Sequence, residues 1–305
     1  MAVGQCHSGE EVNEHKEAGI MKCNVCFRHC DISEGNTGFC GVRKCEGGVI
    51  KPVNYGLVTS LALDPIEKKP LSRFMPGSKI LSVGSFGCNL RCPFCQNSEI
   101  SWGPEAAGFI DTARYVSPEK LSEIALDLKD RGNVGVAYTY NEPLIAYEYI
   151  RDTARIVHEN RMVNVLVSNG CADISVLDEL APFIDAMNID LKGYTDRYYK
   201  DLLKGDLEEV KAFIREAVKI CHVELTTLII PGENDSDEEM RDIADFIASL
   251  KDADGNEIGP GIPLHISRFF PQFNMTDRPA TDVDLIYHLK DVASEKLKYV
   301  YTGNC

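Results

Sequence analysis

From residue 79 onward, short apolar runs alternate with longer amphipathic stretches, and this alternation constrains the fold more than any other feature. The apolar runs are continuous and rich in β-branched residues, as strands buried on both faces should be. They occupy residues 79–86, 134–140, 163–169, 186–192, 223–230 and 263–269. Six strand–helix units in series predict parallel strands joined by right-handed crossovers. Because six units are too few for a closed eight-stranded barrel, we predict an α/β fold with an open, partial (β/α)6 barrel.

The stretches between these runs carry helix start signals. Ser117, Pro118 and Glu119 supply an N-cap, a proline in the first turn and an early negative charge. Ser236 and Glu239 fit a capping box. Helices are therefore the expected crossovers between the strands.

Two segments precede the predicted barrel, which spans residues 79–305. Residues 1–22 are polar, lack the basic and apolar regions of a secretory signal, and are predicted to be mobile. Residues 23–78 combine clustered cysteines with several glycines and short strand-like pieces. We interpret residues 23–78 as a small cysteine-rich N-terminal module placed against the barrel.

The loop after the first predicted strand contains Cys88, Cys92 and Cys95, in the spacing Cys-x3-Cys-x2-Cys. Three thiolates on one short loop can converge on a metal or cluster, and barrel active sites lie at the carboxyl ends of strands. A four-iron cubane needs four ligands, and no fourth cysteine lies nearby in the sequence. The spacing therefore predicts a cluster with one iron open to a substrate or cofactor.

Composition restricts the partners and the compartment. The formal net charge of −15 repels nucleic-acid phosphates, so DNA and RNA are not expected partners. No stretch approaches the roughly 20 apolar residues that a membrane span needs, so no membrane partner is expected. The twelve cysteines are partly clustered in a large chain with no secretory signal. This pattern indicates metal or cluster ligands in a reducing compartment, the cytoplasm.

The cysteine loop resembles the signature of the radical S-adenosylmethionine (SAM) superfamily, in which an aromatic residue, here Phe94, precedes the last cysteine. The resemblance implies a partial barrel of the radical SAM type and a [4Fe–4S] cluster whose open iron is chelated by the amino and carboxylate groups of SAM. An electron from the cluster then cleaves SAM to methionine and a 5′-deoxyadenosyl radical, which abstracts hydrogen from a substrate. The implied partner is a reducing electron donor of the flavodoxin or ferredoxin type.

The resemblance also implies SAM contacts at other strand ends. Residues 140–143, Tyr-Asn-Glu-Pro, take the place of the family's Gly-Gly-Glu-Pro segment, which meets the amino group of SAM. The Glu142 carboxylate or the Asn141 side chain can accept from that ammonium, or the segment only caps the next helix. Ser168 and Asn169 are similar to the Thr-Asn-Gly segment of glycyl-radical-enzyme activases, and Asn169 can present its amide to a ribose or a carboxylate.

The fourth and sixth predicted strands carry charged residues near their ends. Alternation places Asp190 and Lys192 on one face, where opposite charges are costly unless they are paired or bound to a ligand. Asp-Leu-Lys also matches the activases, and a purely structural ion pair is the alternative. His265 and Arg268 lie on the sixth strand, at the barrel mouth, and both are candidate SAM contacts. His265 fits a SAM contact and a satisfied core histidine equally well.

A second group of four thiols lies inside a glycine-rich segment of 18 residues. Its members are Cys23, Cys26, Cys30 and Cys40. Such a set predicts a closed four-thiolate site that holds either zinc or an auxiliary iron–sulfur cluster. Cys45 or His29 can replace one of the ligands. Because the spacing leaves no vacancy, we expect a structural or electron-relay site, not a second SAM site.

Several longer stretches resemble one branch of the superfamily, the radical SAM enzyme of the AmmeMemoRadiSam gene system, which is related to pyruvate formate-lyase activating enzymes. The matching stretches are residues 23–43, 55–71, 76–101, 189–194 and 265–271. The resemblance implies the companion proteins of that system as partners. Members of the branch usually continue past the barrel into a cysteine-bearing tail, whereas this chain stops at Cys305, so the tail is absent or truncated.

Three functions follow from these observations. The leading one is a radical SAM enzyme acting on an unidentified small molecule or protein, with no catalytic side chain assigned. A glycyl-radical-enzyme activase, which acts on a protein backbone, is the second. A non-catalytic protein, whose clusters carry electrons or support a scaffold, is the third. The open iron position and the polar residues at the barrel mouth argue against the third, and these residues do not decide between a protein and a small-molecule substrate.

Overall fold

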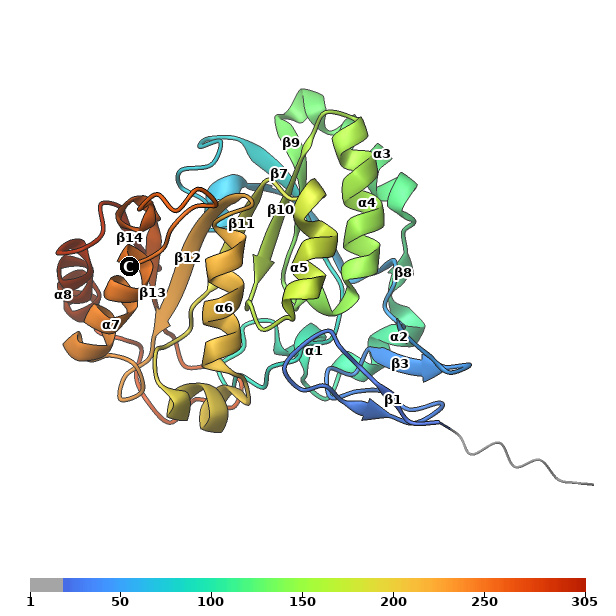
Figure 1. Cartoon of the computed structure of the whole chain (residues 1–305), viewed down its shortest axis with the longest axis horizontal. Coiled ribbons are helices and arrows are strands. Elements are labelled where there is room, and N and C mark those ends of the chain that lie inside the picture. The colour runs from blue at the N-terminus through green and yellow to red at the C-terminus, as the bar shows by residue number, and fades with distance from the viewer. Residues whose placement is uncertain (1–18) are drawn as a thin grey trace, which may run out of the picture.

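The computed structural model describes residues 19–305, and its main feature is an eight-stranded sheet (Figure 1). The strands are β6 (Ser60–Pro65), β7 (Lys79–Gly84), β9 (Asn133–Tyr138), β10 (Val163–Ser168), β11 (Ala186–Asp190), β12 (His222–Ile229), β13 (Leu264–Arg268) and β14 (Val300–Gly303). Their order in space is β14-β13-β12-β11-β10-β9-β7-β6, and every neighbouring pair except β6–β7 is parallel. The predicted α/β fold and its six parallel strands are confirmed.

Two strands extend the sheet beyond the six predicted ones. β14 adds a further parallel strand beside β13, and β6 pairs antiparallel with β7. Within residues 19–305 no pairing joins β6 to β14, so the barrel is open. β6 lies inside the segment interpreted as the N-terminal module, so the sheet begins before residue 79. The prediction of a mobile N-terminus falls largely on residues 1–18, outside the described residues.

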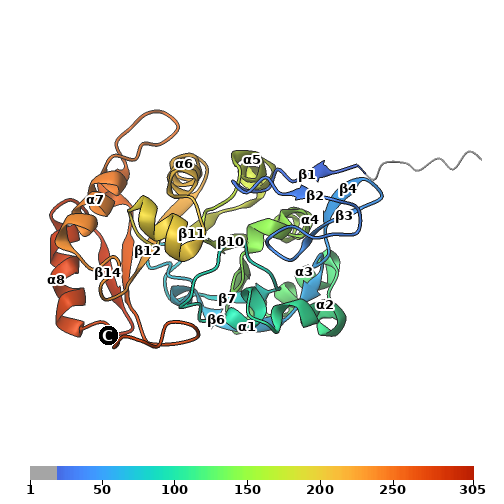
Figure 2. The ribbon, with the colours of Figure 1, turned by 90° about the horizontal axis from the view of Figure 1, so that it is seen from below.

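Helices form the crossovers and cover the outer face of the sheet (Figure 2). The α-helices are α1 (Ser98–Ser101), α2 (Phe109–Thr112), α3 (Pro118–Asp127), α4 (Tyr147–Glu159), α5 (Ile174–Leu180), α6 (Leu207–Ala217), α7 (Asp237–Ala248) and α8 (Val283–Ser294). Shorter turns are the 3-10 segments η1 (Ile66–Lys68), η2 (Ala106–Gly108), η3 (Lys129–Arg131), η4 (Pro143–Ala146), η5 (Ala181–Phe183) and η7 (Gly259–Gly261), and the π-helical η6 (Tyr198–Leu203).

The predicted N-caps of α3 and α7 are confirmed, but only the serine half of the predicted capping box is formed among the described residues, because the Glu239 carboxylate accepts the Tyr194 N–H. Ser117 accepts a hydrogen bond from the backbone N–H of Lys120, and Ser236 accepts one from that of Glu239, both at 3.2 Å. Each cap satisfies a backbone donor that the first helical turn leaves without a partner. Among the described residues, no helix combines the length and apolar character needed to cross a membrane.

The main core lies between the parallel strands and the helices. Leu81, Val136, Leu166 and Ile189 are buried in it on four different strands, whereas Ile80 and Val165 belong to a smaller cluster with Ile66 and Leu71. Burying a side chain of this size stabilises the fold by about 1.5–3 kcal/mol. Because both faces of these strands are covered, their sequences are continuous apolar runs and do not alternate with polar residues.

The N-terminal segment forms hairpins beside the carboxyl ends of the barrel strands, close to α1 (Figure 1). β1 (Met21–Lys22) pairs with β2 (Asp31–Ile32), β3 (Arg43–Glu46) pairs with β4 (Val49–Pro52), and β5 (Leu57–Val58) pairs with β8 (Arg114–Tyr115). Hydrogen bonds and ion pairs attach this segment to the barrel. Among them, the Asp173 N–H donates to the Val25 carbonyl at 2.9 Å, and Arg43 pairs with Glu148 on α4 at 2.6 Å.

A buried carboxylate fastens the loop at the opposite, amino end of the barrel. Glu224 on β12 accepts the backbone N–H groups of Ser72 and Arg73, at 2.9 and 2.7 Å. It also pairs with the Nε2 atoms of His222 and His265, at 2.9 and 2.7 Å. Burial by itself would raise the pKa of Glu224, but these four partners outweigh it and lower the pKa to about 2.

This depressed pKa predicts a pH-dependent contribution to stability. Glu224 ionises near pH 4.5 in the unfolded chain, so its contribution is present above that pH and is lost as the pH falls toward 2. We expect Glu224→Gln to lower the free energy of unfolding by about 3 kcal/mol at pH 7. Urea unfolding of both proteins between pH 7 and pH 3 measures the difference, which should shrink toward pH 3. A difference independent of pH would contradict a role for the charge.

Candidate functional site

The cysteine loop leaves β7 at the carboxyl end of the sheet and enters α1. Gly87, directly before Cys88, has φ +90°, a conformation that favours glycine. A Cβ atom at this position would lie 2.6 Å from Val42 Cγ1 and 3.0 Å from the Cys40 carbonyl oxygen. The turn therefore requires glycine at this position for two reasons: its backbone angle and its close approach to the N-terminal segment.

Asn141, which follows β9, holds the start of this loop. Its Oδ1 accepts the Ser85 N–H at 3.0 Å, and its Nδ2 donates to the carbonyl groups of Phe86 and Gly87, both at 3.1 Å. The amide predicted to contact SAM is thus bonded to the backbone that leads into Cys88. Asn141 is a positioning residue for the cysteine loop.

The segment after β13 holds the other end of the loop. Gln272 donates through Nε2 to the carbonyl of Phe94 at 2.8 Å, and the Asn274 N–H donates to the carbonyl of Pro93 at 2.9 Å. Phe94 is buried. Hydrogen bonds from two distant segments to the backbone of the loop therefore fix the loop at both ends.

Cys92 of this loop is buried, and Cys88 and Cys95 are partly exposed. Burial raises the pKa of Cys88, and it raises the pKa of Cys92 to about 12. Within residues 19–305, no three His, Cys, Asp or Glu side chains are grouped closely enough to bind a single metal ion. An iron–sulfur cubane is larger than an ion and takes each thiolate at a different iron, so wider spacing suits it.

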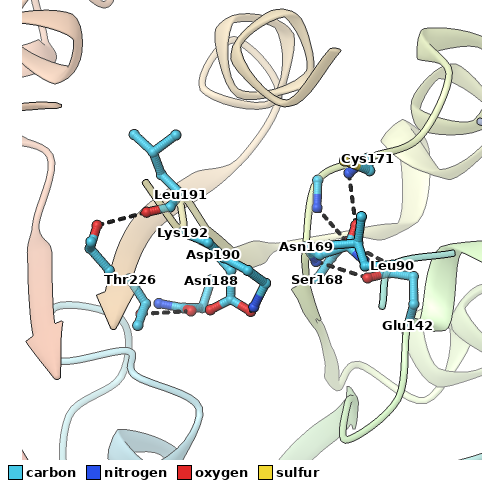
Figure 3. Close-up of polar contacts among 12 residues, drawn as sticks. Leu90, Glu142, Ser168, Asn169, Cys171, Asn188, Asp190, Leu191, Lys192 and Thr226 are labelled. Carbon is cyan, nitrogen blue, oxygen red and sulfur yellow. Dashed lines mark hydrogen bonds and ion pairs between the residues drawn. The ribbon is translucent and has the colours of Figure 1, made fainter. Parts of the chain in front are cut away.

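Glu142 joins the ends of β9 and β10. Its carboxylate accepts the Leu144 N–H at 3.0 Å. It also accepts the Ser168 hydroxyl and the Asn169 N–H, both at 2.8 Å (Figure 3). Glu142 is almost completely buried, and this burial raises its pKa to about 7 although the three hydrogen bonds act in the opposite direction. It is both the N-cap of η4 and a link between two strand ends, so the capping alternative and a site role are compatible.

Tyr140 takes a position where the Gly-Gly-Glu-Pro segment of the resembling family has glycine. Its φ is +77°, a strained conformation that costs a residue other than glycine about 1–3 kcal/mol. Two bonds hold it: Asn97 Nδ2 donates to its carbonyl and its hydroxyl donates to Asp64, both at 2.8 Å. The backbone of Tyr140 therefore keeps the positive φ angle that glycine favours, although its side chain is bulky.

Asn169 links the end of β10 to the cysteine loop (Figure 3). Its Nδ2 donates to Asn89 Oδ1 at 2.9 Å and lies 3.8 Å from Cys88 Sγ. Its Oδ1 accepts the Cys171 N–H at 2.8 Å, and Asn89 donates to the Cys171 carbonyl at 2.6 Å. This chain of amides connects the predicted SAM-binding strand end to the first predicted cluster ligand.

Asp190 and Lys192 form a close pair at the end of β11 (Figure 3). Lys192 Nζ lies 2.7 Å from Asp190 Oδ2. Burial disfavours the ammonium, but the charge of Asp190 and its hydrogen bond outweigh burial and hold the pKa of Lys192 above its ordinary value. The Lys192 backbone is fixed as well: its N–H donates to the Tyr199 hydroxyl at 3.0 Å, and its carbonyl accepts from Asn234 at 2.8 Å.

Two predicted site residues form their hydrogen bonds away from the cysteine loop. His265 lies deeper in the barrel and bonds to Glu224, in the cluster that fastens the amino-end loop. Arg268 donates through Nε to the Thr281 carbonyl at 2.6 Å, and its guanidinium lies 4.8 Å from the centre of the Phe270 ring. These contacts fit the alternative of a satisfied core histidine for His265, and Arg268 ties β13 to the loop that follows.

The four N-terminal cysteines line one small pocket between the hairpins and the barrel: Cys23, Cys26, Cys30 and Cys40. Cys23 and Cys26 are buried, whereas Cys30 and Cys40 are partly exposed. The two alternative ligands do not line this pocket. Cys45 is buried on β3 with its sulfur 3.6 Å from Glu34, and His29 lies on the turn between β1 and β2.

Comparison with known proteins identifies the family. The model of the radical SAM superfamily matches residues 82–247. An uncharacterized protein of Methanocaldococcus jannaschii, MJ0808, is 40% identical over 299 residues, which are 97% of this chain and 83% of that protein. The pyruvate formate-lyase-activating enzyme of Clostridium pasteurianum is 25% identical over 190 residues, covering 60% of this chain and 75% of that enzyme.

A solved structure shares the fold. The Streptococcus suis protein SuiB, in its structure bound to S-adenosylmethionine, superposes with a TM-score of 0.55 at 13% identity over 74% of this chain and 52% of SuiB. The chain belongs to the radical SAM superfamily. It is therefore an enzyme of the class that uses a [4Fe–4S] cluster and SAM. The narrower resemblance to the AmmeMemoRadiSam enzyme stays a prediction.

Several residues of the site are not apparent in the sequence. Asn89 and Asn97 lie in or directly after the cysteine loop, where an amide is a signal for loop bonding. Gln272, Asn234 and Tyr199 give no such signal, because they reach the site from loops and turns far away in the chain.

The raised pKa of Glu142 predicts an effect opposite to that of Glu224. The unfolded chain loses this proton near pH 4.5, whereas the folded chain keeps it to about pH 7, so the native state loses stability over that interval. Relative to Glu142→Gln, the wild type should lose about 3 kcal/mol of unfolding free energy between pH 4.5 and pH 8. Urea unfolding across this range measures the difference. A wild type that gains on the variant with rising pH would contradict the assignment.

Proposed function

We propose that this enzyme reductively cleaves SAM at a [4Fe–4S] cluster held by Cys88, Cys92 and Cys95. When bound, the cluster supplies one electron to SAM, which gives methionine and a 5′-deoxyadenosyl radical that takes hydrogen from the substrate. The spacing of the three cysteines and the position of their loop at the carboxyl end of β7 support this assignment.

The observation that carries the proposal is the meeting of two strand ends at the cysteine loop. Asn141 at the end of β9 bonds to the loop backbone, and Asn169 at the end of β10 lies against Cys88. The Asp190–Lys192 pair lies at the end of the next strand, β11. The strands are parallel, so their carboxyl ends share one edge of the sheet. A ligand bound to the open iron would face these polar groups.

The side chains at these strand ends match the groups of SAM. Glu142 is a carboxylate able to accept from the SAM ammonium, and Lys192 offers an ammonium to the SAM carboxylate. Asp190 and Asn169 can bind ribose hydroxyls. Phe94 contributes as a buried part of the loop, and Asn141 acts through the loop backbone.

The substrate is either a small molecule or a protein. The similarity to a pyruvate formate-lyase-activating enzyme favours a second candidate, an activase that abstracts hydrogen from a protein backbone. Both require a low-potential, one-electron donor, which we infer to be of the ferredoxin or flavodoxin class. Membership of an enzyme superfamily argues against the non-catalytic alternative.

The cluster assignment predicts the effect of removing each thiolate. Cys88→Ala, Cys92→Ala or Cys95→Ala should abolish formation of 5′-deoxyadenosine from SAM and dithionite, because a missing ligand breaks the cluster site. The triple variant should also lose about four irons per chain. Anaerobic purification, iron analysis and chromatography of the nucleoside measure both effects.

A matched control separates this effect from a general loss of cysteine. Cys221 is a half-buried thiol that precedes β12 and bonds to the Ala217 carbonyl. Cys221→Ala should keep both the iron and the nucleoside product. Undiminished SAM cleavage in the triple variant would overturn the cluster assignment.

The Asp190–Lys192 pair predicts a loss of SAM binding. Asp190→Ala or Lys192→Ala should weaken SAM binding by about 1–3 kcal/mol, because a charged hydrogen bond to the ligand is lost. Calorimetric titration of the reconstituted enzyme measures this. Lys200→Ala, which breaks an exposed pair of the same 2.7 Å length with Asp196, should leave binding unchanged. Unchanged SAM affinity with a lowered melting temperature would instead assign Asp190–Lys192 a structural role.

A further inference from the structure

The pocket that is lined by Cys23, Cys26, Cys30 and Cys40 has the ligand set of a metal site. Four thiolates within 18 residues suit either zinc or an iron–sulfur cluster. The spacing of the thiols separates the two choices. Zinc draws four sulfurs to within about 2.3 Å of one point. In the described part of the chain, no three of these groups are gathered around such a point, although all four cysteines face the same pocket.

Arg43 supplies an independent sign of an acceptor in this pocket. It lines the pocket and only 6% of its surface is exposed. Its Nη1 binds Glu148 at 2.6 and 2.8 Å, but its buried Nε has no hydrogen-bond partner within residues 19–305. A buried N–H group without a partner is costly, and a sulfide or thiolate of a cluster would accept from it.

A second unusual arrangement lies between this pocket and the cysteine loop. The guanidinium groups of Arg28 and Arg91 both lie against the ring of Phe39, at 3.4 and 3.8 Å from its centre. Two like charges beside one ring repel each other, and anions close by would lower the cost of that repulsion. Arg28 lines the four-cysteine pocket, whereas Arg91 donates to the Cys88 carbonyl at 2.8 Å. Anionic clusters at both cysteine groups would compensate these two charges.

The two cysteine groups also share a wall. Asn89, the residue after Cys88, lines the four-cysteine pocket and bonds to Asn169 at 2.9 Å. Arg28 donates through Nε to the Asn89 carbonyl at 3.1 Å. Gly87 packs so closely that a Cβ atom would lie 3.0 Å from the Cys40 carbonyl. Backbone contact and single side chains thus separate the two groups.

We propose that the four-cysteine pocket holds an auxiliary [4Fe–4S] cluster that passes electrons to the cluster at Cys88, Cys92 and Cys95. This inference rests on the proposed function, because the second cluster is the acceptor. A protein donor of the ferredoxin class reduces the auxiliary cluster by one electron. The electron then moves to the barrel cluster, and the auxiliary cluster returns to its oxidised state. The barrel cluster transfers the electron to SAM, and a carbon–sulfur bond of the sulfonium breaks.

Metal content tests the auxiliary cluster in the protein that lacks the barrel cluster. The triple variant of Cys88, Cys92 and Cys95 to alanine should retain about four irons per chain and no stoichiometric zinc after anaerobic reconstitution. When reduced, it should show a [4Fe–4S] electron paramagnetic resonance signal that SAM does not alter. One zinc per chain, or absence of any metal in a variant with native circular dichroism, would overturn the inference.

The relay is tested by comparing two electron sources. In Cys26→Ser/Cys30→Ser, 5′-deoxyadenosine formation driven by reduced ferredoxin should fall at least tenfold further than formation driven by dithionite, a small reductant able to reach the barrel cluster directly. Cys45→Ser, at a buried cysteine of the same segment outside the pocket, should leave the ratio of the two rates unchanged. An equal fall with both reductants in the double variant would overturn the relay.

Arg43→Lys tests the spare donor, because lysine keeps a positive charge toward Glu148 but lacks Nε. The midpoint potential of the auxiliary cluster should fall, and that of the barrel cluster should stay the same. An unchanged auxiliary potential would contradict the assigned N–H bond. Failure of the proposed function is distinguishable from all these outcomes, since wild-type enzyme with dithionite would then form no 5′-deoxyadenosine at all.

Discussion

The rest of the site depends on the three hydrogen bonds between Asn141 and the backbone of the cysteine loop. A short loop has to present three thiolates to one cluster, and its own sequence cannot hold that shape. The Asn141 amide binds Ser85, Phe86 and Gly87, and so ties the loop that leaves β7 to the end of β9. Bonds to Phe94 and Pro93 from the segment after β13 hold the far end. The cysteine geometry is therefore a property of the barrel.

Two buried carboxylates at opposite ends of the barrel have opposite effects on stability. At the amino end, Glu224 has four partners and a low pKa, so its charge stabilises the fold. At the carboxyl end, Glu142 has three partners and a pKa raised by burial, so its charge is disfavoured in the folded chain. The stabilising carboxylate therefore lies at the amino end, and the destabilising one lies beside the cysteine loop.

The sequence predicts the six parallel strands well, because strands buried on both faces have long apolar runs. It also predicts where the site lies, since cysteine spacing and strand-end polar residues are local patterns. β14 and β6 are harder to predict because edge strands lack such runs. The partners of Asn141 and His265 are set by segments more than 40 residues away, so no local pattern reveals them. In both cases the residue type indicates a polar, hydrogen-bonding side chain, but it does not indicate which partner that side chain contacts.

We propose that the cysteine loop leaves one iron open and that SAM binds this iron beside Glu142, Asn169 and Lys192. Electron paramagnetic resonance of the reduced, reconstituted enzyme tests this binding mode, with SAM labelled by ¹⁵N at its amino group. We expect a changed cluster signal on SAM addition and a hyperfine coupling between the cluster and the ¹⁵N nucleus. A signal unchanged by SAM, in a protein that holds its iron, would contradict the proposal.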